Sequence, residues 1–160
     1  MRAIALRLSG EQEGIVASLD LLRRAIERDP NYASALGSAA LCHMQLHVSG
    51  WSKDVDRDRR EGVNLARRAL LVADGDPSVF AWSGYVLAYF GENIDAAIEL
   101  IDRALTLNPS FAQGWYWSGM IRLWAGQPEL AIRHFETSLR LSPHARRAIT
   151  FMSIGGSSDQ

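Results

Sequence analysis

The sequence predicts an all-α protein, a solenoid of about four helix hairpins, and three observations lead to this prediction. Pro109 and Pro143 lie 34 residues apart, and the segment between them repeats the pattern of the segment before it. Asp76-Pro77 is typical of a helix start, with a capping carboxylate before a proline in the first turn. Small residues recur at a fixed interval that lets antiparallel helices approach closely, at Ala97, Ala104, Ala131 and Ser138.

The spacing of apolar residues and the turn signals place eight helices along the chain. A residue before proline disfavours helix, so Asp29, Asn108 and Ser142 mark helix ends. Ser52 is the predicted N-cap of the fourth helix, and Ser9-Gly10-Glu11 separates the first two. The predicted helices are 2–8, 12–28, 32–47, 53–73, 77–90, 94–107, 111–125 and 128–141, with one more short helix over 146–154.

One segment resembles the tetratricopeptide repeat in detail. The family places an aromatic and a small residue on its first helix, a small, a large and a small residue on its second, and then a proline. The matching residues are Trp115, Gly119, Ala131, Phe135, Ser138 and Pro143. Ser118 and Arg122 depart from the family's Leu and Tyr. The resemblance implies a right-handed superhelix in which the first helix of each hairpin lines the concave face.

The repeat organises the chain into one domain over residues 1–154. The expected units are 1–30, 31–76, 77–111 and 112–145, with an insertion at 48–58 in the second unit and a flexible tail at 155–160. Trp51, inside the insertion, is expected to fold back onto the scaffold, because large aromatic rings gain most from burial.

The whole chain also resembles a narrower group, the repeat region that follows some bacterial class III adenylate cyclase domains and winged-helix transcription regulators. The resemblance extends over residues 12–145 and includes the segments 24–33, 50–51, 65–70, 101–109 and 140–143. It implies a regulatory or sensory module, and both ends of the sequence favour a fragment of a longer protein. The apolar C-terminal end, with Phe151 and Met152, is a candidate surface for self-association.

Composition excludes several classes of protein. The net charge of −1 among 160 residues argues against nucleic-acid binding, which usually requires a basic excess. No run approaches the ~20 apolar residues of a membrane span, and no secretory signal is present. Cys42 is the only cysteine, which favours a reducing, cytoplasmic setting.

The candidate binding surface is the concave face, which is aromatic and almost uncharged. It lacks the Lys, Arg and Asn residues with which some co-chaperone repeats hold a peptide's C-terminal carboxylate. We therefore expect an apolar or aromatic peptide ligand, while the alternative that the rings fill the superhelix stays open. The candidate residues are Leu41, Met44, Gln45, Trp82, Tyr85, Tyr89, Gln113, Tyr116, Trp117, Met120 and Trp124.

No catalytic, cofactor or metal site is expected. His43 and His47 share a helix face, but no Glu stands beside them in the zinc-protease arrangement, so both are interpreted as structural. The acidic run from Asp54 to Asp58 lacks the glycine and closing glutamate of a calcium loop and is interpreted as a solvated helix start. His134 is expected at the solvated surface. The predicted function is a non-enzymatic protein-binding scaffold, with a signal-sensing or small-molecule-sensing module as the alternative.

Overall fold

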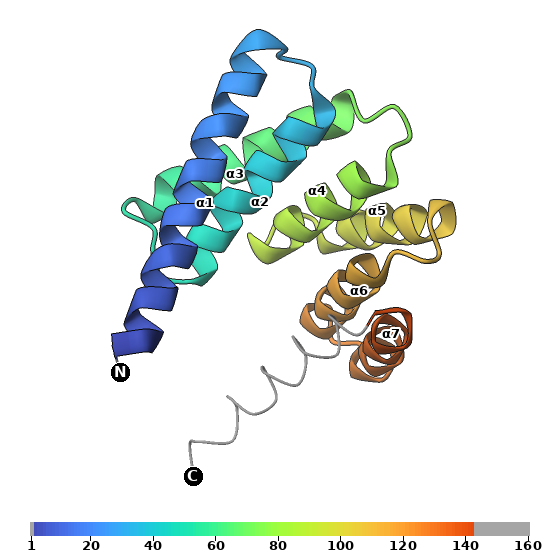
Figure 1. Ribbon diagram of the computed structural model, residues 1–160. Coiled ribbons are helices and arrows are strands. Elements are labelled where there is room, and N and C mark those ends of the chain that lie inside the picture. Colours follow the sequence, from blue (N-terminus) through green and yellow to red (C-terminus); the bar gives the residue numbers. More distant parts are fainter. Residues whose placement is uncertain (1, 143–160) are drawn as a thin grey trace.

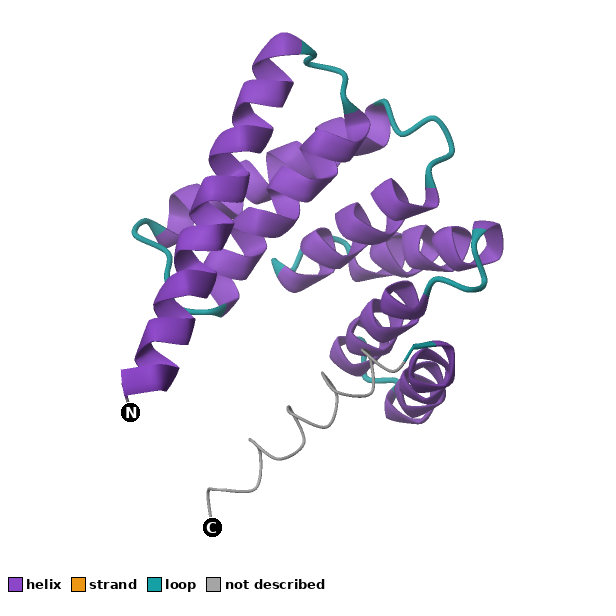
Figure 2. Ribbon diagram, viewed as in Figure 1, coloured by secondary structure: helices purple, strands orange, loops and turns teal. Residues whose placement is uncertain are grey.

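The computed structural model describes the backbone of residues 2–142 and the side chains of residues 10–142, and every regular element in this part is a helix (Figure 2). The all-α prediction is therefore confirmed. The helix predicted over 146–154 and the tail at 155–160 lie outside the described residues. The helices are α1 Arg2–Arg28, α2 Ala33–Val48, α3 Val55–Leu71, α4 Pro77–Tyr89, α5 Ile94–Leu107, α6 Ala112–Trp124 and α7 Pro128–Leu141.

Three consecutive hairpins form the body of the solenoid: α2 with α3, α4 with α5, and α6 with α7. The first helices of the hairpins, α2, α4 and α6, also pack on one another in sequence order (Figure 1). Each hairpin thus covers the apolar side that the previous hairpin leaves open, which is how a repeat protein builds a continuous core. Among residues 2–142, no helix combines the length and apolarity that crossing a membrane requires.

The predicted break near the N-terminus is wrong. α1 runs without interruption from Arg2 to Arg28, where helices at 2–8 and 12–28 were expected, so Gly10 and Gly14 lie inside a helix. A glycine within a helix costs about 1 kcal/mol relative to alanine but does not end it. α1 packs along α2, and no first helix folds back beside it to complete a hairpin among the described residues.

All three first helices end in the same way. The amide of the third residue after each helix end reaches back to a carbonyl five residues earlier, as in Trp51 N to Leu46 O at 2.9 Å. The equivalent bonds are Glu92 N to Leu87 O and Gln127 N to Arg122 O. Glycines with φ between +71° and +77° precede these amides, because the left-handed conformation of this cap strains other residues: Gly50, Gly91 and Gly126.

Side-chain caps fix three of the helix starts, and at α5 the side chain of Asn93 accepts a hydrogen bond from the amide of Ala96. Asp76 accepts a hydrogen bond from the amide of Ser78, and Pro77 is the first helical residue, as predicted. The cap of α3 is Asp54, which accepts from the amide of Arg57, and not Ser52. The predicted cap at Ser52 is therefore wrong, and α3 begins at Val55, two residues after the predicted start at 53.

Small residues sit where the helices of a hairpin come closest. Ala97, Ala104, Ala131 and Ser138 are all fully buried, as predicted. A Cβ added at Gly84 would lie 3.2 Å from the carbonyl oxygen of Ala97. At Gly119 the same atom would lie 2.5 Å from the ring of Phe135. The hairpins therefore depend on the absence of side chains at these two glycines.

Gly119→Ala should destabilise the fold by about 1–3 kcal/mol, since the new methyl group overlaps the Phe135 ring and forces α6 and α7 apart. Urea unfolding followed by circular dichroism measures the change. Gly10→Ala is the matched control: an added Cβ there meets no atom within 4 Å and should leave stability unchanged or slightly raised. Equal stability of the two variants would contradict the packing argument.

Candidate binding site on the concave face

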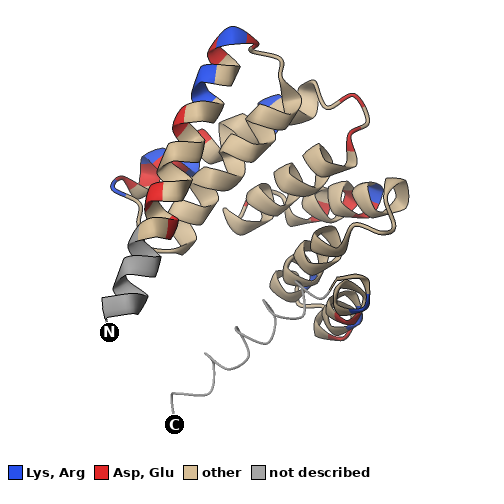
Figure 3. Ribbon diagram, in the orientation of Figure 1, with Lys and Arg blue, Asp and Glu red and all other residues tan. Residues whose placement is uncertain are grey.

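The concave face is formed by α2, α4 and α6, the three first helices. Between them these helices carry one Lys, Arg, Asp or Glu residue, Arg122, and Figure 3 shows the charges gathered on the other helices. The candidate residues predicted from sequence fall into three groups on this face. One group packs into an aromatic stack, a second lines an open furrow, and the remaining four residues belong to neither.

The aromatic stack lies between α4 and α6. Tyr85 is only 8% exposed and inserts between two indoles, with ring centroids 5.3 Å from Trp117 and 5.6 Å from Trp124 and nearly parallel planes. Trp117 and Trp124 are seven residues apart on α6, a rise of about 10.5 Å, which leaves room for one ring between them. Tyr85 and Trp117 are therefore core residues that join two hairpins.

Tyr89 extends the stack toward α2. Its hydroxyl lies 2.7 Å from Nδ1 of His47, and its ring meets Trp124 at a centroid distance of 5.9 Å. Burial raises the pKa of Tyr85 and of Tyr89 above the ordinary value for tyrosine. Both phenols are therefore neutral at physiological pH and offer hydroxyl groups without charge.

The remaining candidates on this face differ in depth. Met44 is buried in the core, and Met120 is half-buried against it. Tyr116 is half-buried, with its ring 5.7 Å from that of Phe135. Gln113 is exposed. None of these four residues lines the furrow described next.

The open part of the concave face is a furrow between α1 and α2. Its larger hollow has a volume of about 430 Å³ and is lined by Ser18, Leu21, Leu22, Ser38, Leu41, Cys42, Gln45 and Trp82. A second hollow of about 420 Å³ shares Ser18, Cys42 and Gln45 and continues to Glu11, Gly14, Ile15, Ser49 and Trp51. Because three residues belong to both hollows, we treat them as one N-terminal furrow.

The furrow exists because α1 is unbroken. If α1 were the second helix of a complete hairpin, the first helix of that hairpin would pack against both α1 and α2. No other described helix occupies this position beside α1 and α2. Trp82 bounds one end, with its ring over Gly37, where an added Cβ would lie 2.9 Å away. Trp51 bounds the other end and packs with Ile15 against the cluster of Leu19, Ala39, Cys42 and Leu46, so the predicted fold-back of Trp51 is confirmed.

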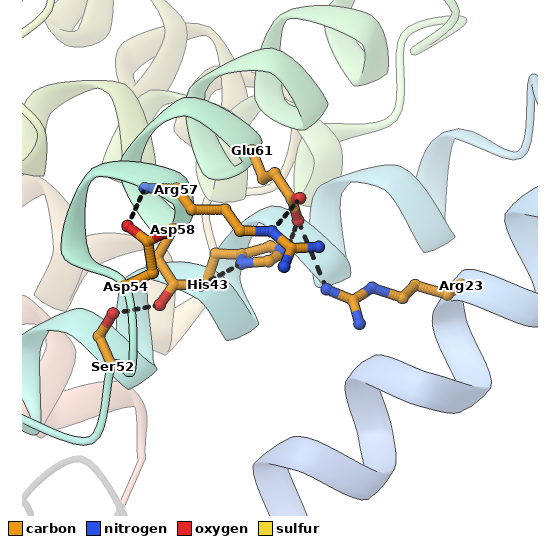
Figure 4. A network of polar contacts seen from close by, with 7 residues as sticks. All are labelled: Arg23, His43, Ser52, Asp54, Arg57, Asp58 and Glu61. Atoms are coloured by element: carbon orange, nitrogen blue, oxygen red, sulfur yellow. Dashed lines mark hydrogen bonds and ion pairs between the residues drawn. The ribbon is translucent and has the colours of Figure 1, made fainter.

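A buried polar network holds the insertion against the repeat (Figure 4). His43 is 2% exposed, and its Nδ1 lies 2.7 Å from a carboxylate oxygen of Asp58. The Ser52 hydroxyl donates to the other oxygen of Asp58. Nε2 of His43 lies 3.1 Å from Glu61, close enough for an ion pair, although the angle is too poor for a hydrogen bond. The interpretation of Asp58 as solvated is therefore wrong.

Glu61 is the charged hub of this network. It accepts a hydrogen bond from Nε of Arg57 at 2.9 Å and lies 3.4 Å from Arg23 on α1. Burial by itself raises the pKa of Glu61, but the Arg57 hydrogen bond and the nearby positive charges outweigh it. The net result is a pKa below the ordinary value of 4.5.

A second polar cluster joins α5, α6 and α7. Arg122 is buried, and its guanidinium donates to both oxygens of Asp102 at 2.6 and 2.8 Å. His134 is half-buried and lies 2.8 Å from the Ser118 hydroxyl, so the expectation that it is solvated is wrong. Burial, followed by the charge of Arg122, lowers the pKa of His134. The neutral ring can therefore accept a hydrogen bond from the Ser118 hydroxyl. Ser118 and Arg122, the two residues that depart from the repeat pattern, are thus buried with polar partners, His134 and Asp102.

These clusters do not assemble a metal site within residues 10–142, where no group of three or more His, Cys, Asp and Glu side chains has the required arrangement. His43 and His47, which share a helix face, point to different partners, Asp58 and Tyr89. Burial raises the pKa of the Cys42 thiol, which keeps it protonated and weakly nucleophilic.

Tyr85→Ser should lower the free energy of unfolding by about 3–5 kcal/mol, because it removes a buried ring between two indoles. Tyr32→Ser is the control, since Tyr32 is 50% exposed and should change stability by less than about 0.5 kcal/mol. Thermal melts of both variants measure the difference. A Tyr85→Ser variant as stable as the control would show that the stack is not part of the core.

The network around Glu61 predicts a dependence of stability on pH. Because the folded-state pKa lies below 4.5, the stabilisation from Glu61 is complete above that value and is lost as pH falls through the folded-state pKa. Glu61→Gln should therefore be less stable than the parent at neutral pH, and the difference in stability should shrink as the pH is lowered below 4.5. Glu13→Gln, at an exposed carboxylate with no ion-pair partner among residues 10–142, is the control. A gap that is constant with pH would contradict this assignment.

Comparisons with known proteins agree with this architecture. Residues 84–146 match the sequence model of the family described as tetratricopeptide repeat. No curated protein matches the sequence. The matched residues include α5, α6 and α7, the part of the chain in which the pattern of small residues is most regular.

Solved structures of similar fold cover most of the chain. A thermophilic tetratricopeptide protein from Thermus thermophilus, TTC0263, superposes with a TM-score of 0.70 at 16% identity, covering 92% of this chain and 77% of that one. The crystal structure of MamA gives 0.57 at 19% identity, covering 93% and 81%. MamA from Desulfovibrio magneticus RS-1 gives 0.57 at 15% identity, covering 86% and 70%. Residues 84–146 thus match the tetratricopeptide repeat model, and the described chain has the superhelical fold seen in tetratricopeptide repeat proteins.

Proposed function

We propose that this protein is a non-enzymatic scaffold that binds an apolar segment of a protein in the N-terminal furrow. Repeat solenoids use their concave surfaces for such binding. The observation that carries the proposal is the division of the concave face. In the aromatic stack the rings pack against one another and leave no space for a ligand. In the furrow between α1 and α2, by contrast, no side chain of the described residues fills the two hollows.

The furrow is suited to a helix. Its lining residues on α2 are Ser38, Leu41, Cys42 and Gln45, which recur at intervals of three and four and so form a stripe along one side of that helix. α1 contributes a facing stripe with the same spacing. Two parallel stripes on antiparallel helices form the groove into which an amphipathic helix packs its apolar side.

The chemistry of the furrow selects an uncharged segment. Glu11 is the only charged residue among those that line its two hollows, and it lies at the end near Trp51. A charged side chain placed among Leu22, Leu41 and Trp82 would lose hydration without gaining a partner. For the same reason we propose no clamp for a terminal carboxylate. The one Lys or Arg on α2, α4 or α6 is Arg122, which is buried and paired with Asp102.

A regulatory role in a bacterial cytoplasm is part of this proposal. It is supported by the resemblance to the repeat regions of adenylate cyclases and winged-helix regulators. The single cysteine is in keeping with a reducing compartment. A signal-sensing or small-molecule-sensing module is the alternative, and native mass spectrometry separates the two, since a bound metabolite would favour sensing.

Trp82→Ala should weaken binding of peptides selected on this protein from a displayed random library. Loss of a tryptophan that anchors an interface typically costs at least about 2 kcal/mol, or roughly 30-fold in Kd. Fluorescence anisotropy of labelled peptides measures the effect. Because Trp82 is partly buried, Gln45→Lys provides a second variant, which places a charge in the furrow without removing core contacts.

Ile132→Ala is the control for these binding measurements. Ile132 is 56% exposed on α7, outside the furrow, and its substitution should leave Kd unchanged. The proposal fails if no peptide is selected, or if selected peptides bind the folded Trp82→Ala and Gln45→Lys variants as tightly as the parent.

A further inference from the structure

Another hollow lies between α1, α2 and α3, away from the furrow. The furrow takes Ser38 and Cys42 from α2, whereas this hollow takes Ala39 and His43, the residues that follow them in the chain. Because consecutive residues of a helix point about 100° apart, the two spaces lie on different sides of α2. The hollow has a volume of about 360 Å³, within the range of about 300–1,000 Å³ that is usual for small-molecule sites. We call it the polar hollow.

The floor of the polar hollow is apolar. It consists of Ile26 from α1, Ala39 from α2 and Leu65 from α3. Ala39 is fully buried, while Ile26 and Leu65 are half-buried and keep part of their surface open to the hollow. An aliphatic side chain placed on this floor would exchange contact with water for contact with an apolar surface, which favours binding.

Four charged side chains form the rim, two of each sign: Arg23 and Glu27 on α1, and Glu61 and Arg68 on α3. Arg23 lies 3.4 Å from Glu61, and Arg68 donates to the carbonyl of Pro30 at 3.5 Å. These two contacts place α1 and α3 side by side and in the same direction. The rim is therefore neutral as a whole, and each of the two helices contributes one charge of each sign.

Two of the rim charges have no counter-ion. Neither Glu27 nor Arg68 forms an ion pair with another residue in the range 10–142. The guanidinium of Arg68 has five N–H donors and uses one of them, in the long contact to Pro30. A ligand that carries both an ammonium group and a carboxylate would pair with Glu27 and Arg68 at once.

The inner end of the hollow offers acceptors for an ammonium group. Nδ1 of His43 faces a carboxylate oxygen of Asp58, so this nitrogen carries a proton, and in the neutral ring Nε2 is an acceptor. Nε2 is buried, makes no hydrogen bond and lies 3.1 Å from the Glu61 carboxylate, which is also an acceptor. Figure 4 shows Arg23 reaching Glu61 from α1 beside His43. Because the Arg23 side chain is 49% exposed and this contact is long, a ligand cation can replace it at low cost.

We propose that the polar hollow binds a small zwitterion, an α-amino acid with an aliphatic side chain. Glu27 and Glu61 hold its ammonium group, and Arg68 donates two parallel hydrogen bonds to its carboxylate. The aliphatic side chain of the ligand lies on Ile26 and Leu65. A ligand without net charge matches the neutral rim, and both of its charged groups exchange hydration for charge-assisted hydrogen bonds.

This site is independent of the proposed peptide-binding function. The polar hollow shares no lining residue with the furrow. Gln45→Lys, which should weaken peptide binding, should therefore leave the affinity for the amino acid unchanged. A chain that binds an amino acid in the polar hollow but no selected peptide would refute the peptide scaffold and leave this inference standing.

Titration of the isotope-labelled full chain with L-leucine, followed by nuclear magnetic resonance, tests the proposal. We expect saturable shifts of the amide signals of Ala39, Asn64 and Leu65, which line the hollow, and no shift of the signal of Gln45 in the furrow. Leucinamide lacks the carboxylate and isocaproate lacks the ammonium group, so each should bind at least about tenfold more weakly than leucine. The proposal is overturned if millimolar leucine gives no saturable shifts, if the shifts centre on the furrow, or if the two analogues bind as tightly as leucine.

Variants at the two unpaired charges test which group of the ligand each one holds. Glu27→Gln and Arg68→Gln should each weaken leucine binding at least about tenfold. Glu27→Gln should not change the affinity for isocaproate, which has no ammonium group for Glu27 to hold. Glu99→Gln and Arg133→Gln are the matched controls, at exposed side chains of α5 and α7 outside the hollow, and should bind leucine like the parent. If Glu27→Gln or Arg68→Gln, folded as judged by circular dichroism, binds leucine as tightly as the parent, the zwitterion site is refuted.

Discussion

The structure depends on the close approach of antiparallel helices at positions without a large side chain. Gly84 lies against the backbone of α5, and Gly119 lies under the Phe135 ring. Ala131 and Ser138 complete the contact between α6 and α7, and the Ser138 hydroxyl donates to the carbonyl of Ala112 at 2.7 Å. Because each hairpin is closed tightly in this way, its remaining apolar surface is presented to the next hairpin, and the solenoid grows in one direction.

This packing also determines how the concave face is used. Packing of α4 on α6 brings Tyr85 between Trp117 and Trp124. Most of the aromatic rings on this face therefore pack between hairpins and are not exposed to a ligand. At the N-terminal end no described helix fills the equivalent position beside α1 and α2, and the furrow remains open. In the proposed function, recognition is thereby displaced from the aromatic centre of the face toward the end where the repeat is incomplete.

Polar groups stabilise the places where the pattern of repeats is interrupted. The insertion after α2 is tied down by His43, Asp58 and Ser52, a network in which a buried imidazole faces carboxylates on α3. Arg122, at a position where the repeat prefers Tyr, is accommodated because Asp102 on α5 pairs with it. Breaking either pair would leave a buried polar group without compensation, which is costlier than losing the contact itself.

The sequence by itself determined the all-α class, six helices to within two residues at their ends, and the helices that form the concave face, because hydrophobic period, small residues and prolines are local signals. The sequence placed Leu41, Gln45 and Trp82 on the same face as Tyr85 and Trp117. It did not distinguish the residues that line the furrow from those buried in the stack, because periodicity indicates which way a side chain points and not how deeply it is buried. Only the tertiary structure decided that separation, together with the unbroken path of α1 through Gly10 and the partners of His43 and His134. The separation and the partners of the two histidines depend on contacts between residues distant in the chain. The unbroken α1 reflects instead that a glycine costs a helix only about 1 kcal/mol and does not have to end it.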